Sequence, residues 1–367
     1  MPSDVQIEID GEYWDHWSTV TLTERADSIA QASLTCNFQP ERKKFRDVFR
    51  PFSYHEMVLY VGGVVRFVGT IMSIEPQVTA TSSEVSVSAY ALPGVLGDVT
   101  ATPDQFPTEY RNLKLDKLAK AICDPIGIKV VMGASSPEIL DLDTGKTILD
   151  IDVEPGAVFE KVSLKPGQKI LELLIELAKQ RALVITSTFE GDLLIYTPSS
   201  DVSDVVATLT EDRPVVSVTP NFSTQEYYSS LTGISKTKGG KTGSRYTVNN
   251  PKLEDNFDIQ RPFVYELSDT DPADVPAAVE ARMGRMFADA ITYDIDLAAE
   301  YDQSGFYWEP NRYITLEAPK AMVYTKTPLY IMQTELTFTP DSKTAKLSCI
   351  LPGSLSGDLP RKLPWEE

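Results

Sequence analysis

Hydrophobic and polar residues alternate with a period of two along the first quarter of the chain. Runs of this kind occupy residues 5–9, 18–23, 32–38, 55–61, 64–74 and 84–91. Alternation puts every second side chain on one face, as in a half-buried β-strand. Gly62 and Gly63 separate two of the runs and form a two-residue hairpin signal. Residues 1–98 are therefore predicted to be a closed antiparallel β structure, either a barrel or a sandwich.

A helical period replaces this alternation in the middle of the chain. One short amphipathic helix is predicted over residues 113–122, and a second begins near Gln168. The second helix has a wide apolar face made by Ile170, Leu171, Leu173, Leu174, Ile175 and Leu177. Two β-rich runs at 183–188 and 193–196 follow it, with a turn at Gly191 between them. This pattern predicts a small α/β region.

The last part of the chain returns to β character. Candidate strands lie at 215–219, 227–234, 246–249, 263–267, 288–298, 313–317, 329–339 and 344–351, and one helix at 273–290 interrupts them. We therefore expect an α+β fold, mainly β, in which two β-barrel domains at 1–98 and 201–353 are connected by an α/β domain at 99–200. Residues 354–367 contain several prolines and glycines and are expected to be a tail.

Composition narrows the class of protein. The 367 residues carry a formal net charge of −19, which argues against nucleic-acid binding through phosphate contacts. The three cysteines are far apart and imply no disulfide framework, which favours a reducing compartment. No apolar run is long enough to span a membrane, and the N-terminus carries no basic, apolar signal region. We expect a soluble protein without a membrane partner.

The one strongly basic stretch lies at residues 40–51. It contains Arg42, Lys43, Lys44 and Arg46, in a chain that is otherwise acidic. Such a density of positive charge is typical of a surface that pairs with a neighbouring protein, and it is also compatible with simple solvation. We treat these four residues as candidates for an interface.

Candidate catalytic motifs are incomplete. Residues 235–242 nearly match a phosphate-binding loop, but Ser235 replaces the first glycine and no helix start follows. Residues 143–145 read Asp-Thr-Gly, the triplet of aspartic proteases, but the chain has no second copy to share the proton. His16 lies in an aromatic cluster and His55 heads a strand, so both are expected to be structural. We predict no catalytic residues and no bound cofactor.

A metal site is also not predicted. The segment 141–154 contains five acidic residues, namely Asp141, Asp143, Asp150, Asp152 and Glu154. Their spacing departs from that of a calcium-binding loop, and apolar residues alternate with them, so a strand with one solvated face explains the pattern better. A glycosidase needs only two carboxylates, however, and the low number of histidines does not exclude one.

Residues 304–311 (SGFYWEPN) are the most specific stretch of the chain, and Gly305, Trp308, Pro310 and Asn311 carry the pattern. Followed by the strands at 313–317 and 329–332, this stretch resembles the C-terminal signature of the baseplate hub proteins of contractile-tailed phages. These are the Mu-type tail protein P family, which is related to the late-control D proteins of P2-like phages. The Pro-Gly-Gln turn at 166–168 and its helix are similar to the same family.

The resemblance implies a structural protein rather than an enzyme. It implies a homotrimeric ring in which two tube-like barrels per chain match the hexameric tail tube, while the opposite face holds the trimeric central spike. It also implies contacts with other baseplate proteins, and a channel through which DNA passes without specific binding. The location implied is the tail baseplate of a virion that is assembled in the cytoplasm of a bacterial host. Trp308 and Pro310 are expected to order the second barrel.

Two alternatives stay open at this point. One is a tail-associated cell-wall hydrolase that uses a carboxylate pair in 141–154, for example Asp143 and Asp152. The other is the spike base of a related contractile injection or secretion system, which would share the fold. Loss of cell-wall hydrolysis on changing the two aspartates to asparagine would favour the enzyme, and ring formation without such activity would favour the hub.

Overall fold

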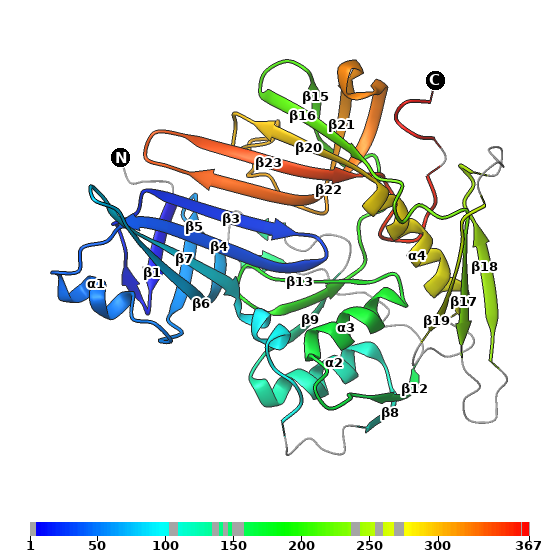
Figure 1. The fold of residues 1–367 in the computed structure, drawn as a ribbon, viewed down its shortest axis with the longest axis horizontal. Coiled ribbons are helices and arrows are strands. Elements are labelled where there is room, and N and C mark those ends of the chain that lie inside the picture. Colours follow the sequence, from blue (N-terminus) through cyan, green and yellow to red (C-terminus); the bar gives the residue numbers. More distant parts are fainter. Residues whose placement is uncertain are drawn as a thin grey trace.

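The computed structural model describes residues 5–102, 109–133, 139–141, 146–148, 158–235, 243–253, 260–267, 275–360 and 362–366. The structure is mainly β, as the hydrophobic pattern predicted, and the described residues contain four α-helices, three of which the pattern located. Figure 1 shows the N-terminal strands on one side, the C-terminal strands above them, and the α/β region below. None of the helices in these residues is long and apolar enough to cross a membrane.

The N-terminal region follows the predicted alternation closely. Its elements are β1 (Val5–Ile9), β2 (Glu12–Tyr13), β3 (Thr19–Arg25), β4 (Ser28–Asn37), α1 (Lys43–Val48), β5 (Glu56–Val61), β6 (Val64–Val78) and β7 (Ser83–Ala91). Burial alternates along the strands, because the apolar side chains of each strand share one face. The basic stretch forms the short helix α1, which the sequence pattern did not predict.

The middle region forms around the predicted helices. Its elements are β8 (Glu109–Leu113), α2 (Leu115–Cys123), β9 (Val130–Gly133), β10 (Ile139–Asp141), β11 (Lys146–Ile148), β12 (Phe159–Ser163), α3 (Ile170–Lys179), β13 (Val184–Ser187) and β14 (Leu193–Tyr196). Strand β14 pairs antiparallel with β13 and parallel with β9. Gly191 makes the predicted hairpin turn with a φ of 87°, a conformation that favours glycine.

The C-terminal region contributes to two sheets. Its elements are β15 (Val205–Thr210), β16 (Val215–Phe222), β17 (Ser230–Ser235), β18 (Arg245–Asn249), β19 (Pro262–Leu267), α4 (Val275–Ala290), β20 (Ile291–Leu297), β21 (Tyr313–Ala318), β22 (Val323–Phe338) and β23 (Lys343–Ile350). Strands β17, β18 and β19 form a small separate sheet beside α4 (Figure 1). The other strands join the large sheet.

One continuous sheet carries strands of both β-rich regions. Its order is β16-β20-β23-β22-β3-β4-β7-β6-β5-β1-β2, with β21 and β15 branching from β22. The join is the antiparallel pairing of β3 with β22, in which Leu22 lies opposite Leu336. The sequence pattern suggested two barrels that each close on themselves, because alternation identifies a strand but not the neighbour with which it pairs. The domain boundaries at 98, 200 and 353 stay predictions.

The large sheet contains the same five-stranded unit twice. The order β3-β4-β7-β6-β5 corresponds to β16-β20-β23-β22-β21. The long hairpins of the two units also share one irregularity. Pairing of β6 with β7 shifts between Ile71 and Ser73, and pairing of β22 with β23 shifts between Ile331 and Gln333.

The turns of these two hairpins repeat as well. Thr79 and Ser82 close the first, and Thr339 and Ser342 close the second. In each, the threonine hydroxyl accepts from the serine backbone N–H, at 2.9 Å and 3.0 Å. Both second strands are followed by the tripeptide Leu-Pro-Gly, at 92–94 and 351–353. Matched register, bulge and turn indicate that the two units are copies of one structural plan.

Candidate interaction site

Helix α1 presents the predicted basic residues because its other side is anchored by aromatic rings. Phe45 is 1% exposed and Phe49 is buried. Their ring centroids lie 4.9 Å and 5.2 Å from that of Trp14, in edge-to-face arrangements. A helix of six residues has little stability of its own, so this aromatic contact holds it on the sheet.

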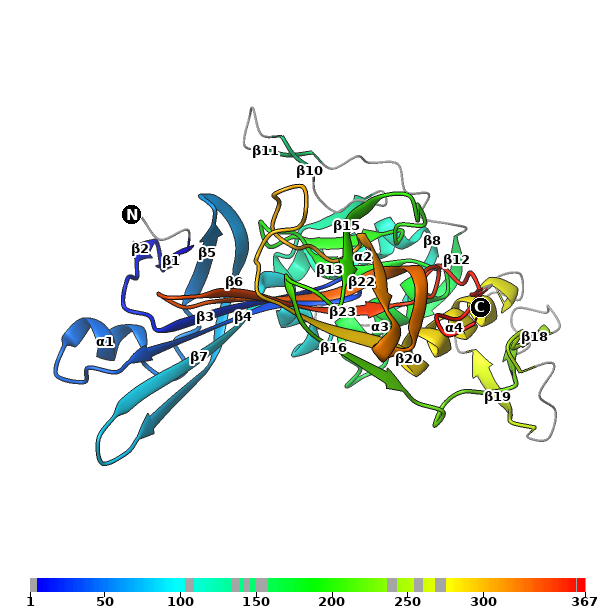
Figure 2. The same cartoon turned by 90° about the horizontal axis from the view of Figure 1, so that it is seen from above.

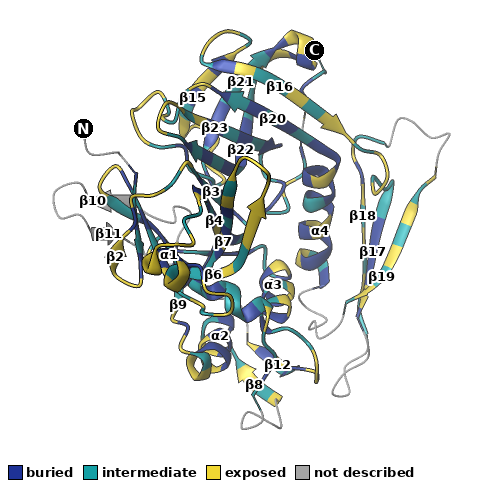
Figure 3. Cartoon of the chain, turned by 60° about the vertical axis from the view of Figure 1, so that its left-hand side comes forward, coloured by how far each residue is buried: buried dark blue, intermediate teal, exposed yellow. Residues whose placement is uncertain are grey.

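The structure places Arg42, Lys43, Lys44 and Arg46 together on the exposed side of α1, which is mostly yellow in Figure 3. Lys44 Nζ lies 3.6 Å from a carboxylate oxygen of Glu12. The Arg46 guanidinium donates to the backbone oxygens at 40 and 41, at 2.7 Å and 3.2 Å. Among the described residues, the side chains of Arg42 and Lys43 have no hydrogen bond or ion pair. These two are therefore the better candidates for contact with another protein.

An aromatic loop beside α1 extends this surface. Phe52 is 90% exposed and Tyr54 is 61% exposed, and their φ angles are 60° and 52°. Left-handed backbone is unusual for bulky residues and is found where surrounding contacts impose it. One such contact is His55, whose ring bonds Asp10 through Nδ1 and the backbone oxygen of Asp47 through Nε2 at 3.1 Å. This loop was not predicted, although aromatic residues next to a basic run were a signal for it.

The residues of the SGFYWEPN motif order a loop of the C-terminal region. Trp308 is 1% exposed, and its indole N–H donates to the backbone oxygen of Ala299 at 3.1 Å. Asn311 has a φ of 65° and is buried. Its side-chain oxygen accepts from the backbone N–H of Ser199 and from the hydroxyl of Tyr330, each at 2.8 Å. The motif therefore connects the start of the C-terminal region to strand β22.

Gly305 and Pro310, the other two motif residues, lie in the same loop. Gly305 has a φ of 84°, and its N–H donates to the backbone oxygen of Asp302 at 3.2 Å. Pro310 is half-buried between Glu309 and Asn311. The positive φ explains the need for glycine at the turn.

Glu309 belongs to a buried charge cluster that joins all three regions. Arg66 on β6 is 5% exposed and donates two hydrogen bonds to Glu24 on β3, at 3.1 Å and 3.0 Å. It also lies 3.1 Å from Glu309 and donates to the backbone oxygen of Trp308 at 3.2 Å. Its guanidinium carbon lies 4.6 Å from the ring centre of Phe189, in the β13–β14 hairpin. Burial raises the pKa of Glu309, and the Arg66 charge opposes that rise.

In the part of the chain that the structure describes, metal-ligating side chains are not clustered and the thiols are buried. No group of three or more histidine, cysteine or acidic residues in it could hold a metal ion. Cys36 and Cys123 are buried, and burial raises the pKa of each thiol to about 12. Most of the acidic segment 141–154, including Asp143 and Asp152, lies outside the described residues, as does nearly all of 235–242.

Comparison with known proteins identifies the fold. No family model matches the chain. The baseplate hub protein gp44 of Escherichia phage Mu is 22% identical over 332 residues, which cover 89% of this chain and 82% of that protein. Two solved structures each match with a TM-score of 0.74 and 17% identity: the 43 kDa tail protein of prophage MuSo2 from Shewanella oneidensis and a tail protein from Neisseria meningitidis MC58. They cover 95% and 96% of this chain, and 98% of their own chains.

These matches extend over nearly the whole chain, so they include both five-stranded units and the α/β region between them. The relative from phage Mu is named as a baseplate hub protein. The resemblance to the baseplate hub proteins is therefore confirmed: this chain is similar in sequence to the Mu baseplate hub protein and has the fold of Mu-like phage tail proteins.

Proposed function

We propose that this chain is the structural baseplate hub of a contractile phage tail, where it forms a trimeric ring between the hexameric tail tube and the trimeric central spike. It would be located in the virion, after assembly in the bacterial cytoplasm. The observation that carries the proposal is the repeated five-stranded unit in the large sheet. Three chains with two equivalent units each present six units, which resolves the mismatch between threefold and sixfold symmetry.

The repeat also suggests how copies join. Within one chain, residues Gln333–Phe338 of β22 pair with β3 of the first unit. The equivalent residues of β6 are 73–78, and in the described residues they pair only with β7. The equivalent of β3 is β16, which in the described residues pairs only with β20. Each chain therefore has one free edge at residues 73–78 of β6 and another at β16. The β6 edge of one copy can pair with the β16 edge of the next.

The exposed apolar residues on these two edges support this pairing. Transferring the register of β22 and β3 to the free edges places Val78 opposite Val218 of the next copy, and Ile74 opposite its Phe222. Val78 is 77% exposed and Phe222 is 39% exposed in the single chain. Phe338 and Val20, the counterparts of Val78 and Val218 at the internal join, are fully buried. Figure 2 shows the far end of the β6–β7 hairpin projecting from the rest of the chain, where a neighbour can reach it.

Absolute mass by light scattering across a dilution series tests the ring. We expect a species of three times 40.7 kDa. Val78→Asp should shift it to the monomer, because a charge would be buried at the edge. Val264→Asp is the matched control, since Val264 is 58% exposed on the separate small sheet. A wild-type monomer at every concentration, or equal effects of the two substitutions, would count against the proposed ring.

The proposal includes no catalysis. Its partners are the tail tube, the central spike and other baseplate proteins, and DNA passes through the ring without specific binding. The net charge of −19 supports the last point, because an acidic lumen repels phosphates. A cell-wall hydrolysis assay on the purified chain and on the Asp143→Asn, Asp152→Asn double variant checks the enzymatic alternative. Activity that the double variant lacks would replace the structural hub with a hydrolase.

A further inference from the structure

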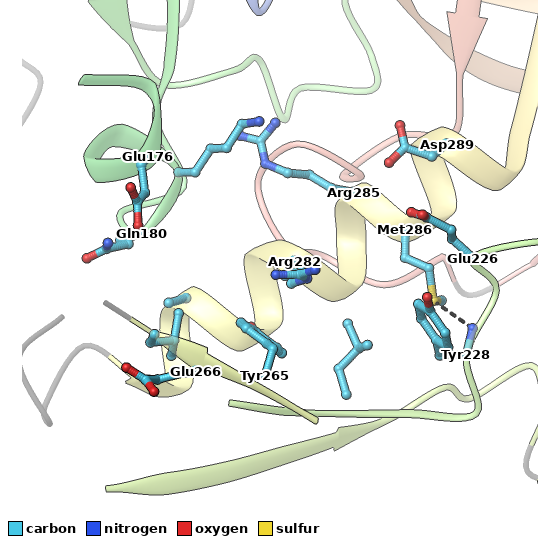
Figure 4. A pocket seen from close by; sticks show the side chains of 14 residues that line it. Glu176, Gln180, Glu226, Tyr228, Tyr265, Glu266, Arg282, Arg285, Met286 and Asp289 are labelled. Carbon is cyan, nitrogen blue, oxygen red and sulfur yellow. Dashed lines mark hydrogen bonds between the residues drawn. The ribbon is translucent and has the colours of Figure 1, made fainter. Parts of the chain in front are cut away.

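A cavity of about 390 Å³ lies between α3, α4 and the small sheet. Helix α3 contributes Glu176, Lys179 and Gln180 to its lining. Figure 4 shows Arg282 and Arg285 extending into it from α4, with Tyr265 of β19 on the far wall. The candidate interaction site on α1 and the buried Arg66 cluster do not contribute to this cavity.

Three cations line the cavity without a salt bridge in the described part of the chain. They are Lys179, Arg282 and Arg285. The Nε and Nη2 groups of Arg285 are buried and have no hydrogen-bond partner there. The guanidinium of Arg282 lies 4.0 Å from the ring centre of Tyr265, which holds its plane in one orientation. Buried guanidinium N–H groups without acceptors are unfavourable, so a ligand that supplied acceptors to Arg285 would be stabilised here.

The electrostatics of two of these cations, Arg285 and Lys179, agree with this interpretation. Burial lowers the pKa of Arg285, and desolvation and then the Arg285 charge lower the pKa of Lys179. An anion between the two would oppose both effects.

Carboxylates of the chain also line the cavity, at Glu176, Glu226, Glu266 and Asp289. Asp27 and Asp289 act on Arg285 only as more distant charges, and Figure 4 shows Arg285 extending away from Asp289 toward α3. The acidic groups therefore leave the buried guanidinium N–H groups without an acceptor.

The rest of the lining combines Gln180 and two tyrosines, Tyr228 and Tyr265, with four apolar side chains. Leu231, Leu267, Ala278 and Met286 face the same space as the cations. We propose that this cavity binds a carboxylate carried on an apolar body, which is the chemistry of an acidic peptide segment from a partner protein. The guanidinium of Arg285 would donate to the carboxylate, Arg282 would provide a second donor, and the apolar wall would hold the neighbouring side chain.

Fluorescence anisotropy with a labelled peptide of alternating Glu and Leu tests the site. Because the cavity lies within one chain, the measurement can be made on the monomer or on the assembled ring, and its result does not depend on ring formation. Arg285→Gln should weaken binding by about tenfold or more, the loss of a charge-assisted hydrogen bond. Arg245→Gln is the matched control, because Arg245 is exposed on β18 and does not line the cavity. The same peptide with Gln for Glu should not bind.

Two further measurements separate loss of binding from loss of folding, and peptide binding from simple anion binding. Unfolding of ligand-free Arg285→Gln should occur at no lower denaturant concentration than that of wild type, since the charge it removes is unpaired. If that variant fails to fold, Arg282→Gln takes its place. Inorganic phosphate should compete only weakly, because it lacks the apolar part. The proposal is overturned if the wild-type protein does not bind the peptide, or if Arg285→Gln and the control Arg245→Gln bind it equally. It is also overturned if phosphate competes as well as unlabelled peptide.

Discussion

Replacing Arg66 with methionine should separate the structural role of the charge cluster from that of ordinary surface ion pairs. Methionine keeps much of the side-chain volume but leaves the buried Glu24 and the partly buried Glu309 without the Arg66 charge. Arg66 is 5% exposed and makes two hydrogen bonds to Glu24 and an ion pair with Glu309. Removing one partner of a buried ion pair costs about 3–5 kcal/mol, and we expect a loss of stability in that range. Arg312→Met, which breaks a partly exposed pair with Asp204, should cost about 1 kcal/mol or less.

The pH dependence gives this prediction a specific sign. Burial raises the pKa of Glu309 in the folded chain. A carboxyl group whose folded pKa is raised destabilises the fold when it is ionised, and the cost disappears as the pH falls below its unfolded value. Without Arg66, the destabilisation caused by ionised Glu309 should be larger at neutral pH. It should shrink as the pH falls from about 7 to about 4. Urea unfolding of both variants across this range measures it. A penalty equal to that of Arg312→Met, or one independent of pH, would refute the reasoning.

Three other predictions concern the motif and the core. Trp308→Ala should destabilise the chain by about 3–5 kcal/mol in urea unfolding, because the indole is 1% exposed; an unchanged midpoint would show that Trp308 does not order the C-terminal region. Asn311→Ala should cost about 2–3 kcal/mol, since two donors lose their acceptor and φ is 65°; Asn311→Gly should recover the backbone part, and no recovery would contradict that part. Cys349 is buried and its thiol pKa is raised by burial, so a thiol reagent at pH 8 should modify it only after unfolding; modification at the rate of a free thiol in folded protein would contradict the burial.

The sequence predicted the elements that local pattern controls. Period-two alternation located most strands of both β-rich regions, and the apolar stripe of Ile170–Lys179 located helix α3. Gly191 was identified as a turn because a positive φ favours glycine. The residues around Trp308 carried the resemblance to the baseplate hub proteins, and the similarity to the Mu protein agrees with it. The four basic residues at 42–46 lie together because they are close in the sequence, and their role as an interface stays a prediction.

Only the tertiary structure determined which strands are neighbours. The join of β3 to β22 and the repeated five-stranded unit depend on hydrogen-bond register between residues far apart in the chain, and a strand's own sequence encodes its faces but not its partner. Helix α1 was missed because aromatic contacts with Trp14, rather than helical period, stabilise it. The cluster of Lys179, Arg282 and Arg285 was invisible for the same reason, since α3 and α4 bring its members together only when they pack around the small sheet.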